Sequence, residues 1–335
     1  MTFTVPAEWA PHRAMWLGFP SHADLWEEDL EPAQLEVAAL ARALAGPGRE
    51  RVRLLACGDA GMAAARRHLG GVDGVEIRRG QFGDIWFRDT GPIFLESSGP
   101  ERTCAGFRIN GWGGKYVLEG DDAVAAQIAD ASGARLIMHD VILEGGALDH
   151  DGAGTLLTTR QCVLNPNRNP GWDEAAAEAL FAEALGARKV LWLGDGLHAD
   201  HTDGHVDNLA RFVAPGVVLC PMAYGEDDPN AEVYAAAAEA LAGMTDATGA
   251  RLKVIRIPSP GRIVDEDGEV IAASHMNFLI ANGAVVAPVY DEAAAGPALH
   301  VLRTLFADRE VIPLPSRAIL TGGGSFHCIT QQEPA

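Results

Sequence analysis

One cysteine near the end of the chain lies in a setting that indicates chemistry. Cys328 closely follows the three consecutive glycines of residues 322–324. Glycine adopts backbone conformations that other residues avoid, and it allows another group to approach the main chain closely. The segment therefore indicates either a nucleophile at the floor of a cleft or a buried thiol beside a tight turn, since free cysteine also packs as a small hydrophobic residue.

A second segment, residues 198–207, is dense in histidine and aspartate. His205 and Asp207 are two positions apart at the start of a strand predicted over residues 206–213, and alternate residues of a strand share one face. Three interpretations stay open. The pair could ligate a divalent metal, His205 could move protons for a thiol while Asp207 holds a cation, or both could be polar caps of a strand.

Acidic and aromatic side chains occur close together in residues 84–90, which predict a further strand. Asp84, Trp86 and Arg88 share one parity, and Asp89 has the other. A guanidinium or ammonium group binds well between an aromatic face and a carboxylate, so Asp84, Trp86 and Asp89 are candidate substrate-binding residues. The alternative is a surface ion pair between Arg88 and an aspartate.

Glu144 is a third acid of interest, because two glycines follow it directly. Glycines at this place again allow close approach of the backbone to a site. An ordinary tight turn explains the same pattern. On this segment alone, both interpretations stay open.

The elements that must position these residues follow a repeated order. Helices are predicted over residues 32–45, 121–132, 173–185, 230–247 and 292–306, with a shorter one over 61–68. A β-branched segment follows each long helix, which predicts strands at 51–57, 135–138, 189–193, 252–257 and 310–313. Further strands are predicted at 154–158, 206–213, 217–222, 276–280 and 284–289. This recurrence predicts an α/β repeat architecture in one domain over residues 1–335, and a closed propeller and an open sheet both fit it.

The composition narrows the class of protein. The chain has 335 residues, is 48% hydrophobic and carries a formal net charge of −20. That charge argues against nucleic-acid and anionic-membrane partners and favours a small cationic ligand, although solubility alone also explains it. The uncharged residues 270–290 contain enough polar side chains to favour two buried strands over a membrane span.

Cysteine usage predicts the compartment. Five cysteines without a CxxC pair are not a disulfide framework, and no signal peptide is visible, so a reducing cytoplasm is expected. Assembly into a homo-oligomer stays open. Apart from Cys328, the cysteines lie in apolar segments and are expected in the core. They are Cys57, Cys104, Cys162 and Cys220.

Eight segments in the chain form a recognisable set of motifs. They are residues 6–9 (PAEW) with Pro11 and His12, 84–92 (DIWFRDTGP), 112–116 (WGGKY), 143–146 (LEGG), 164–170 (LNPNRNP), 202–208 (TDGHVDN), 277–278 (NF) and 322–332 (GGGSFHCITQQ). Taken together, they resemble the agmatine deiminase family, which belongs to the guanidine-modifying superfamily called the penteins and includes bacterial peptidyl-arginine deiminase-like proteins. They run in family order from near residue 6 to residue 332, so the resemblance covers nearly the whole chain.

The resemblance implies a fold and a mechanism. The fold would be a five-bladed, pseudo-symmetric α/β propeller. Cys328 would attack the guanidinium carbon to form a covalent amidino-thioether, and His205 would protonate the departing ammonia and then activate water. Glu144 would orient His205. The acids implied to clamp the guanidinium nitrogens are Asp89 and Asp207.

The reaction implied is hydrolysis of agmatine to N-carbamoylputrescine and ammonia, a step of polyamine biosynthesis, with no metal and no cofactor. Arginine or peptidyl-arginine is the alternative substrate within this class. A different class is a metal-dependent hydrolase built on His198, His201, His205 and the nearby aspartates. The chain departs from the family pattern at His275, Leu279 and Ser325-Phe326, which are expected to affect only the pocket for the far end of the substrate.

Overall fold

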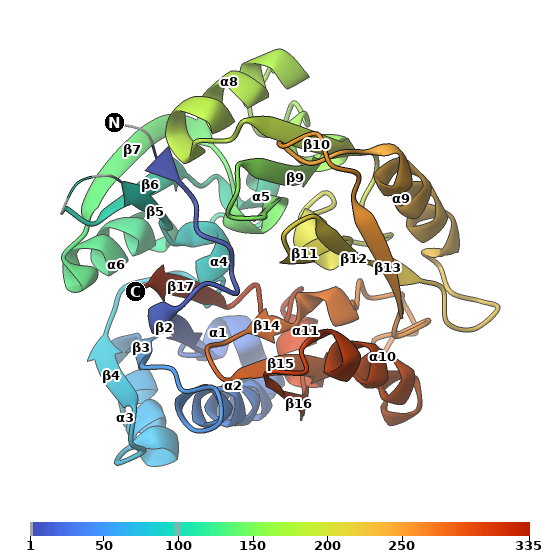
Figure 1. The fold of residues 1–335 in the computed structure, drawn as a ribbon. Helices are drawn as coiled ribbons and strands as arrows, with labels where there is room; N and C mark the ends of the chain where they lie inside the picture. The colour runs from blue at the N-terminus through green and yellow to red at the C-terminus, as the bar shows by residue number, and fades with distance from the viewer. Residues whose placement is uncertain (1–2, 98, 100) are drawn as a thin grey trace.

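Five small sheets surround a common centre, and the longer helices lie outside them (Figure 1). The computed structural model describes residues 3–97, 99 and 101–335. Two sheets have four strands: β17 (Thr330–Pro334), β2 (His12–Phe19), β3 (Val52–Ala56), β4 (Val75–Arg79); and β1 (Phe3–Thr4), β5 (Ile93–Ser97), β6 (Thr103–Arg108), β7 (Arg135–Ile142). Three have three strands: β8 (Leu148–His150), β9 (Thr155–Thr159), β10 (Lys189–Leu193); β11 (Arg211–Ala214), β12 (Val217–Met222), β13 (Lys253–Pro258); and β14 (Leu279–Ile280), β15 (Ala284–Val289), β16 (Glu310–Pro315).

One strand–strand–helix–strand unit underlies every sheet. Its first two strands are antiparallel and its last two are parallel, and a helix crosses between the parallel strands. These crossing helices are α2 (Leu30–Ala45), α6 (Val124–Ser132), α8 (Glu174–Leu185), α9 (Ala231–Gly243) and α10 (Glu292–Leu305). In one sheet the first strand is β17, which pairs antiparallel with β2 near the other end of the chain. The last strand, β17, thus joins the sheet of the early strand β2, whereas β1 pairs with β5 in the neighbouring sheet.

The predicted helices are confirmed, because their apolar stripes and caps act locally. Asp173 caps α8 by accepting from Ala176 N, and Asp291 caps α10 by accepting from Ala293 N and Ala294 N. Helix α3 (Gly58–Leu69) is the shorter helix expected over residues 61–68. Helix α9 ends at Gly243, before the predicted end, since Thr245 turns into a bridge with Arg251.

Two buried strands do form in the uncharged stretch of residues 270–290. Strands β14 and β15 pair antiparallel, with Leu279 opposite Val286. In the part of the chain that the structure describes, no helix has both the length and the apolar character needed to cross a membrane.

Short helical turns precede the first strand of four units. They are α4 (Phe87–Thr90), η3 (Gly145–Ala147), η4 (Val206–Asn208) and η5 (His275–Asn277). Three of them, α4, η4 and η5, replace parts of strands that the sequence predicted. The predicted strand over residues 84–90 is therefore wrong, since its second half is α4, and the strand predicted over 206–213 is confined to β11. The strand predicted over 276–280 is likewise reduced to β14. Helix α4 lies toward the centre of the molecule (Figure 1), and the four turns pack in chain order, α4 on η3, η3 on η4 and η4 on η5.

Candidate active site

A cavity of about 310 Å³ leads from the surface to Cys328, whose side chain is almost fully buried. Acidic and aromatic side chains dominate its wall. The lining residues are Leu25, Trp26, Glu27, Glu28, Asp29, Asp84, Trp86, Asp89, Trp112, Tyr116, Leu118, His201, Thr202, Thr321, Gly322, Gly323 and Cys328. The cysteine thus sits at a cleft floor, as one of its two interpretations required.

The glycines before Cys328 make room for two indole rings. A Cβ on Gly322 would lie 2.8 Å from Trp86 Cζ2 and 2.9 Å from Trp26 Cη2, and one on Gly324 would lie 2.6 Å from Trp86 Cζ3. The two rings are stacked with centroids 6.3 Å apart. The close approach predicted from the glycines is therefore present, and the groups that approach are indoles of the cavity wall.

Asp89 is held rigidly in the cavity wall from the short helix α4. Its Oδ2 accepts a hydrogen bond from Trp112 Nε1 at 2.8 Å, and its Oδ1 accepts from Gly146 N at 2.9 Å. Trp112 itself has a left-handed backbone (φ 52°) within α5 (Gly111–Gly114), which turns its indole toward Asp89. Burial raises the pKa of the Asp89 carboxyl, so this group gains stability from a cationic partner.

His205 and Asp207 extend into the same region from the turn that precedes β11. Asp203 (φ 62°) and Gly204 (φ 87°) are both left-handed, and they turn the chain into η4. A Cβ on Gly146 would lie 2.6 Å from His205 Nδ1, 2.7 Å from Asp89 Oδ1 and 3.3 Å from Asp207 Oδ2. Gly146 must therefore be glycine for three functional groups to converge. The strand alternation that suggested their convergence is absent, because η4 replaces the strand.

The sulfur of Cys328 lies beside Asp207 and Asn277. Asp207 Oδ2 is 3.5 Å from Sγ, and Asn277 Nδ2 is 3.0 Å from Sγ. Asn277 Oδ1 accepts from the backbone N–H groups of His327 and Cys328, at 2.9 and 3.2 Å, and so fixes the loop. Burial, together with the charges of Asp207 and Asp89, raises the pKa of the Cys328 thiol well above its ordinary value.

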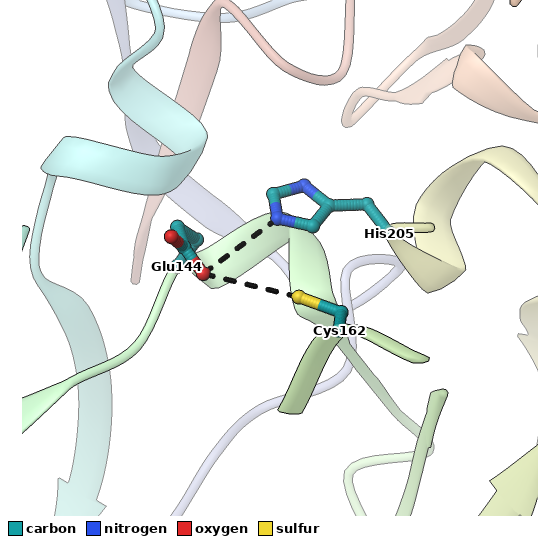
Figure 2. A group of neighbouring side chains, drawn as sticks. All are labelled: Glu144, Cys162 and His205. Atoms are coloured by element: carbon teal, nitrogen blue, oxygen red, sulfur yellow. Dashed lines mark hydrogen bonds and ion pairs between the residues drawn. The ribbon is translucent and has the colours of Figure 1, made fainter. Parts of the chain in front are cut away.

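Glu144 faces the ring of His205, and Cys162 lies close to both (Figure 2). Its Oε2 is 3.8 Å from His205 Nε2 and 4.0 Å from Cys162 Sγ, while its Oε1 accepts from Arg168 Nε at 2.7 Å. The distance of 3.8 Å makes an ion pair rather than a hydrogen bond. Burial acts to lower the pKa of His205. The carboxylate of Asp89 opposes this most strongly, and Cys162 and Glu144 add to its effect, so the pKa of His205 is raised well above its ordinary value.

Glu144, Cys162 and His205 form the one group of three metal-type donors found among the described residues. The Arg168 guanidinium already forms an ion pair with Glu144, and its positive charge disfavours a metal cation at this place. The metal site expected for the alternative function is not assembled: His201 lines the cavity mouth and stacks on Tyr116 at 5.7 Å, and neither His198 nor His201 joins such a group.

Asp84 and Trp86 line the cavity as well, but the oxygens of Asp84 are already bound. Oδ1 accepts from Trp26 Nε1 at 2.9 Å, and Oδ2 accepts from Trp86 Nε1 at 2.7 Å. Burial raises the pKa of Asp84 to about 6. This acid therefore orients the two indoles of the wall, and its contact with substrate stays a prediction.

Arg88 is not the surface ion-pair partner that the sequence allowed. It is buried, and it donates from Nη1 to Gln332 Oε1 at 2.7 Å and from Nε to His327 O at 3.3 Å. Lys115, the other cation among the resembling segments, binds Asp203 Oδ1 at 2.6 Å. Neither side chain belongs to the cavity lining.

The departures from the family pattern lie outside the cavity lining. His275 is buried, pairs with Pro288 O at 3.1 Å and packs against Tyr290, and burial lowers its pKa to about 4. It is therefore neutral at physiological pH. Leu279 and Phe326 are buried apolar residues, and Ser325 Oγ pairs with Ser316 Oγ at 2.7 Å.

Some functional candidates carried no assigned role in the sequence. His327, Arg168, Asn277 and Trp112 lie within the segments that resemble the family, yet only the structure shows what they touch. Glu27, Glu28 and Asp29 at the cavity mouth lie outside those segments. The adjacency of His327 to Cys328 was the one sequence signal available for that residue.

Comparison with known proteins places the chain in a family over its full length. The model of the Porphyromonas-type peptidyl-arginine deiminase family matches residues 4–334. An agmatine deiminase of Pseudomonas aeruginosa (strain LESB58) is 37% identical over 359 aligned positions, covering 99% of this chain and 96% of the relative. The agmatine deiminase of Ectopseudomonas mendocina (strain ymp) is also 37% identical, with coverage of 99% and 96%.

Solved structures agree with these relatives. The agmatine deiminase of Enterococcus faecalis superposes with a TM-score of 0.92 at 33% identity, covering 99% of this chain and 96% of that one. An amidinotransferase from Microseira wollei shares only the fold, with a TM-score of 0.57 at 11% identity over 98% and 96% of the two chains. The mixed α/β fold is therefore that of the pentein superfamily. The chain belongs to the Porphyromonas-type peptidyl-arginine deiminase family, and its full-length curated relatives are agmatine deiminases.

Proposed function

We propose that this protein is an agmatine deiminase, which hydrolyses agmatine to N-carbamoylputrescine and ammonia. One observation supports the choice of substrate: the cavity that ends at Cys328 is lined by five carboxylates and, among the described residues, by no arginine or lysine. Agmatine has a guanidinium at one end and an ammonium at the other, so both ends are cations. An acid-lined cavity attracts such a molecule along its whole length.

The guanidinium binds between Asp89 and Asp207 in this proposal. The fork of N–H donors on a guanidinium pairs well with carboxylates on two sides. Asp207 Oδ1 is buried without a hydrogen-bond partner among the described residues, so it is free to accept from the substrate. The guanidinium carbon then lies against the Cys328 sulfur, because Asp207 is 3.5 Å from that atom.

Substrate binding activates the nucleophile. In the empty site the two aspartates oppose a thiolate, which is why the pKa of Cys328 is raised. A bound guanidinium neutralises their charge and favours the thiolate. The thiolate attacks the carbon, an amino group accepts a proton from His205 and leaves as ammonia, and an amidino-thioether remains on Cys328.

Water completes the reaction. His205, now neutral, takes one proton from water as the oxygen attacks the amidino carbon. The C–S bond then breaks and the second proton of that water passes to the departing sulfur, which releases N-carbamoylputrescine and the Cys328 thiol. Glu144 supports the imidazolium from its other side at 3.8 Å. The raised pKa of His205 suits the first step, since the proton donor must be charged when ammonia leaves.

Free arginine and peptidyl-arginine are the alternative substrates. Arginine would carry its carboxylate into the acid-lined cavity, where neither Arg88 nor Lys115 reaches it. A colorimetric assay of carbamoyl products across agmatine, arginine and a blocked arginine peptide tests the assignment. Product from agmatine above all is expected, and product from arginine or the peptide alone would overturn it.

The alternative of a metal-dependent hydrolase makes a different prediction. Activity in the deiminase mechanism needs only protein side chains, and Arg168 disfavours a cation at Glu144. Dialysis against a chelator is expected to leave turnover unchanged. Loss of activity that added metal restores would favour the hydrolase instead.

We also propose that the five sheets are the blades of a pseudo-symmetric propeller and that residues 1–335 form one catalytic domain. The repeated strand–strand–helix–strand unit and the pairing of β17 with β2 support this view. The cytoplasm remains the expected compartment, and assembly into a homo-oligomer remains open. Size-exclusion chromatography with light scattering measures the assembly directly.

A further inference from the structure

We propose that His327 is a positioning residue for the reaction: held as an imidazolium between Asp207 and Glu8, it orients Asp207 and keeps that carboxylate ionised for the guanidinium. This inference rests on the function proposed above, in which Asp207 clamps the substrate. His327 directly precedes Cys328 in the chain, and both of its ring nitrogens face carboxylates, Nδ1 that of Asp207 and Nε2 that of Glu8. Because both nitrogens are engaged in this way, His327 acts through Asp207 rather than on the substrate.

The His327 ring bridges two carboxylates. Nδ1 lies 2.8 Å from Asp207 Oδ2, and Nε2 lies 3.1 Å from Glu8 Oε2, with the side chain only 4% exposed. An ionised carboxylate only accepts hydrogen bonds, and a neutral imidazole donates only one. A neutral ring would therefore point a bare nitrogen at an oxygen. A ring protonated on both nitrogens satisfies both contacts, and both become charge-assisted.

Glu8 is a fixed anchor for this ring. Its Oε2 also pairs with Arg211, and its Oε1 accepts from Ile280 N at 2.7 Å. Arg211 continues the network through Nε to Asp149 Oδ2 at 3.0 Å. Anions and cations thus alternate from Asp207 through His327, Glu8 and Arg211 to Asp149. Since Glu8 is bound independently of His327, it can hold the ring, and the ring can hold Asp207.

As a consequence, the two carboxylate oxygens of Asp207 have different roles. Oδ2 faces His327 and lies beside the Cys328 sulfur, whereas Oδ1 is left buried and unpaired in the described structure. Burial acts to raise the pKa of Asp207, but His327, through its hydrogen bond and its charge, lowers it. The other charged or titratable groups around Asp207 are His205, Arg211, Asp89, Arg88 and Cys328.

The test compares His327→Gln with His275→Gln, because both histidines are 3% exposed and only His327 touches the site. His327→Gln is expected to lower kcat/KM for agmatine by about 100-fold, as removal of one partner from a buried ion pair does. The acid limb of its pH profile should move to higher pH, since Asp207 without the imidazolium protonates at higher pH. His275→Gln should leave that limb in place. An acid limb that stays unmoved in folded His327→Gln overturns the proposal.

A second measurement works without turnover and without the His327 variant. Ring ¹⁵N spectra are recorded on His205→Asn at roughly two pH units above the ordinary histidine pKa. This variant removes one other buried imidazole that faces carboxylates, and the added change His12→Gln removes the remaining one, whose Nδ1 lies 2.9 Å from Glu50 Oε1. A doubly protonated ring that persists in the double variant is therefore expected from His327. If no such ring is present, the proposal fails. If the wild-type enzyme leaves agmatine unchanged, the proposed function fails, while this spectrum still decides the state of His327.

Discussion

The inner end and the mouth of the cavity are both acidic, yet they are built differently. At the inner end Asp89 is buried, and both of its oxygens are fixed by Trp112 and Gly146. At the mouth Glu27 and Glu28 are exposed on the short turn η1 (Glu27–Asp29), which follows α1 (Ala23–Trp26). The inner charges are therefore desolvated and immobile, and the outer charges are hydrated.

Because of this difference, we expect the inner carboxylates to take part in the reaction and the outer carboxylates to attract the substrate. A fixed, desolvated carboxylate interacts strongly with one guanidinium geometry, because little water screens it. A hydrated carboxylate acts weakly on any cation that approaches, and salt screens it further. Changes at the inner end should therefore alter kcat/KM by orders of magnitude, and changes at the mouth should alter it by single factors.

The largest effect is expected for Cys328→Ser. Serine is a far weaker nucleophile here, since its hydroxyl is much less acidic than the thiol, so kcat should fall by at least about 1,000-fold. Steady-state assays measure the loss, and mass spectrometry of wild type quenched during turnover should show an adduct on Cys328. Cys57→Ser is the control, because that thiol is similarly buried but bonds only to Gly80 O and Phe82 O. Substantial turnover by Cys328→Ser would refute the covalent mechanism.

A smaller but still large effect is expected for Asp89→Asn, about 100-fold in kcat/KM. The change leaves guanidinium donors without their charged acceptor, and unpaired buried charged groups cost roughly 1–3 kcal/mol or more. Thermal melting should show a fold that is retained. Asp207→Asn is expected to behave alike.

Asp84→Asn is the matched control in the same wall. Its oxygens already serve Trp26 and Trp86, so the change should lower the melting temperature more than kcat/KM. Equal kinetic losses in Asp84→Asn and Asp89→Asn would show that both acids bind substrate, as the acidic and aromatic side chains of residues 84–90 suggested.

The third effect tests the whole length of the cavity. Agmatine should exceed free arginine by about 100-fold in kcat/KM, because placing an unpaired carboxylate among acids costs several kcal/mol, with tenfold for each 1.4 kcal/mol. His275 does not offset this cost, since burial keeps it neutral. Parallel assays on the two compounds decide the matter, and equal efficiencies would contradict the agmatine assignment while leaving the deiminase chemistry intact.

The sequence predicts the outer units better than the inner turns. Helix α8 and strand β10 follow from alanine-rich periodicity, the Asp173 cap and β-branched residues, which are local signals. The turn η4 does not follow from local signals, because contacts with distant segments hold it. Asp207 contacts His327, and His205 contacts Asp89 and Glu144. Local propensity in such short polar segments yields to tertiary contacts.

The candidate site residues were predicted chiefly through the resemblance of their segments to a family, and their roles stay predictions. The structure brings Cys328, Asp207, His205, Asp89 and Glu144 together around Gly146 and Asn277, although the strand geometry expected for His205 and Asp207 is wrong. The contacts between side chains of the site could not be predicted from the sequence. Glu8 and His327, for example, are 319 positions apart and come into contact only in the folded chain. The same holds for Arg168, whose role depends on a contact with Glu144.

The smallest effect is expected at the mouth, for the triple change Glu27→Gln, Glu28→Gln and Asp29→Asn. Removing these charges should raise KM for agmatine by about threefold to tenfold and leave kcat nearly unchanged, because exposed charges act through a screened field. The difference from wild type should shrink in high salt, and the preference over arginine should narrow. The matched control removes three exposed charges far from the cavity lining, at Asp130, Glu183 and Glu239. If that control raises KM equally, net charge rather than the mouth attracts the substrate; if the mouth variant loses kcat instead, the mouth takes part in the chemistry and the contrast between the two ends of the cavity fails.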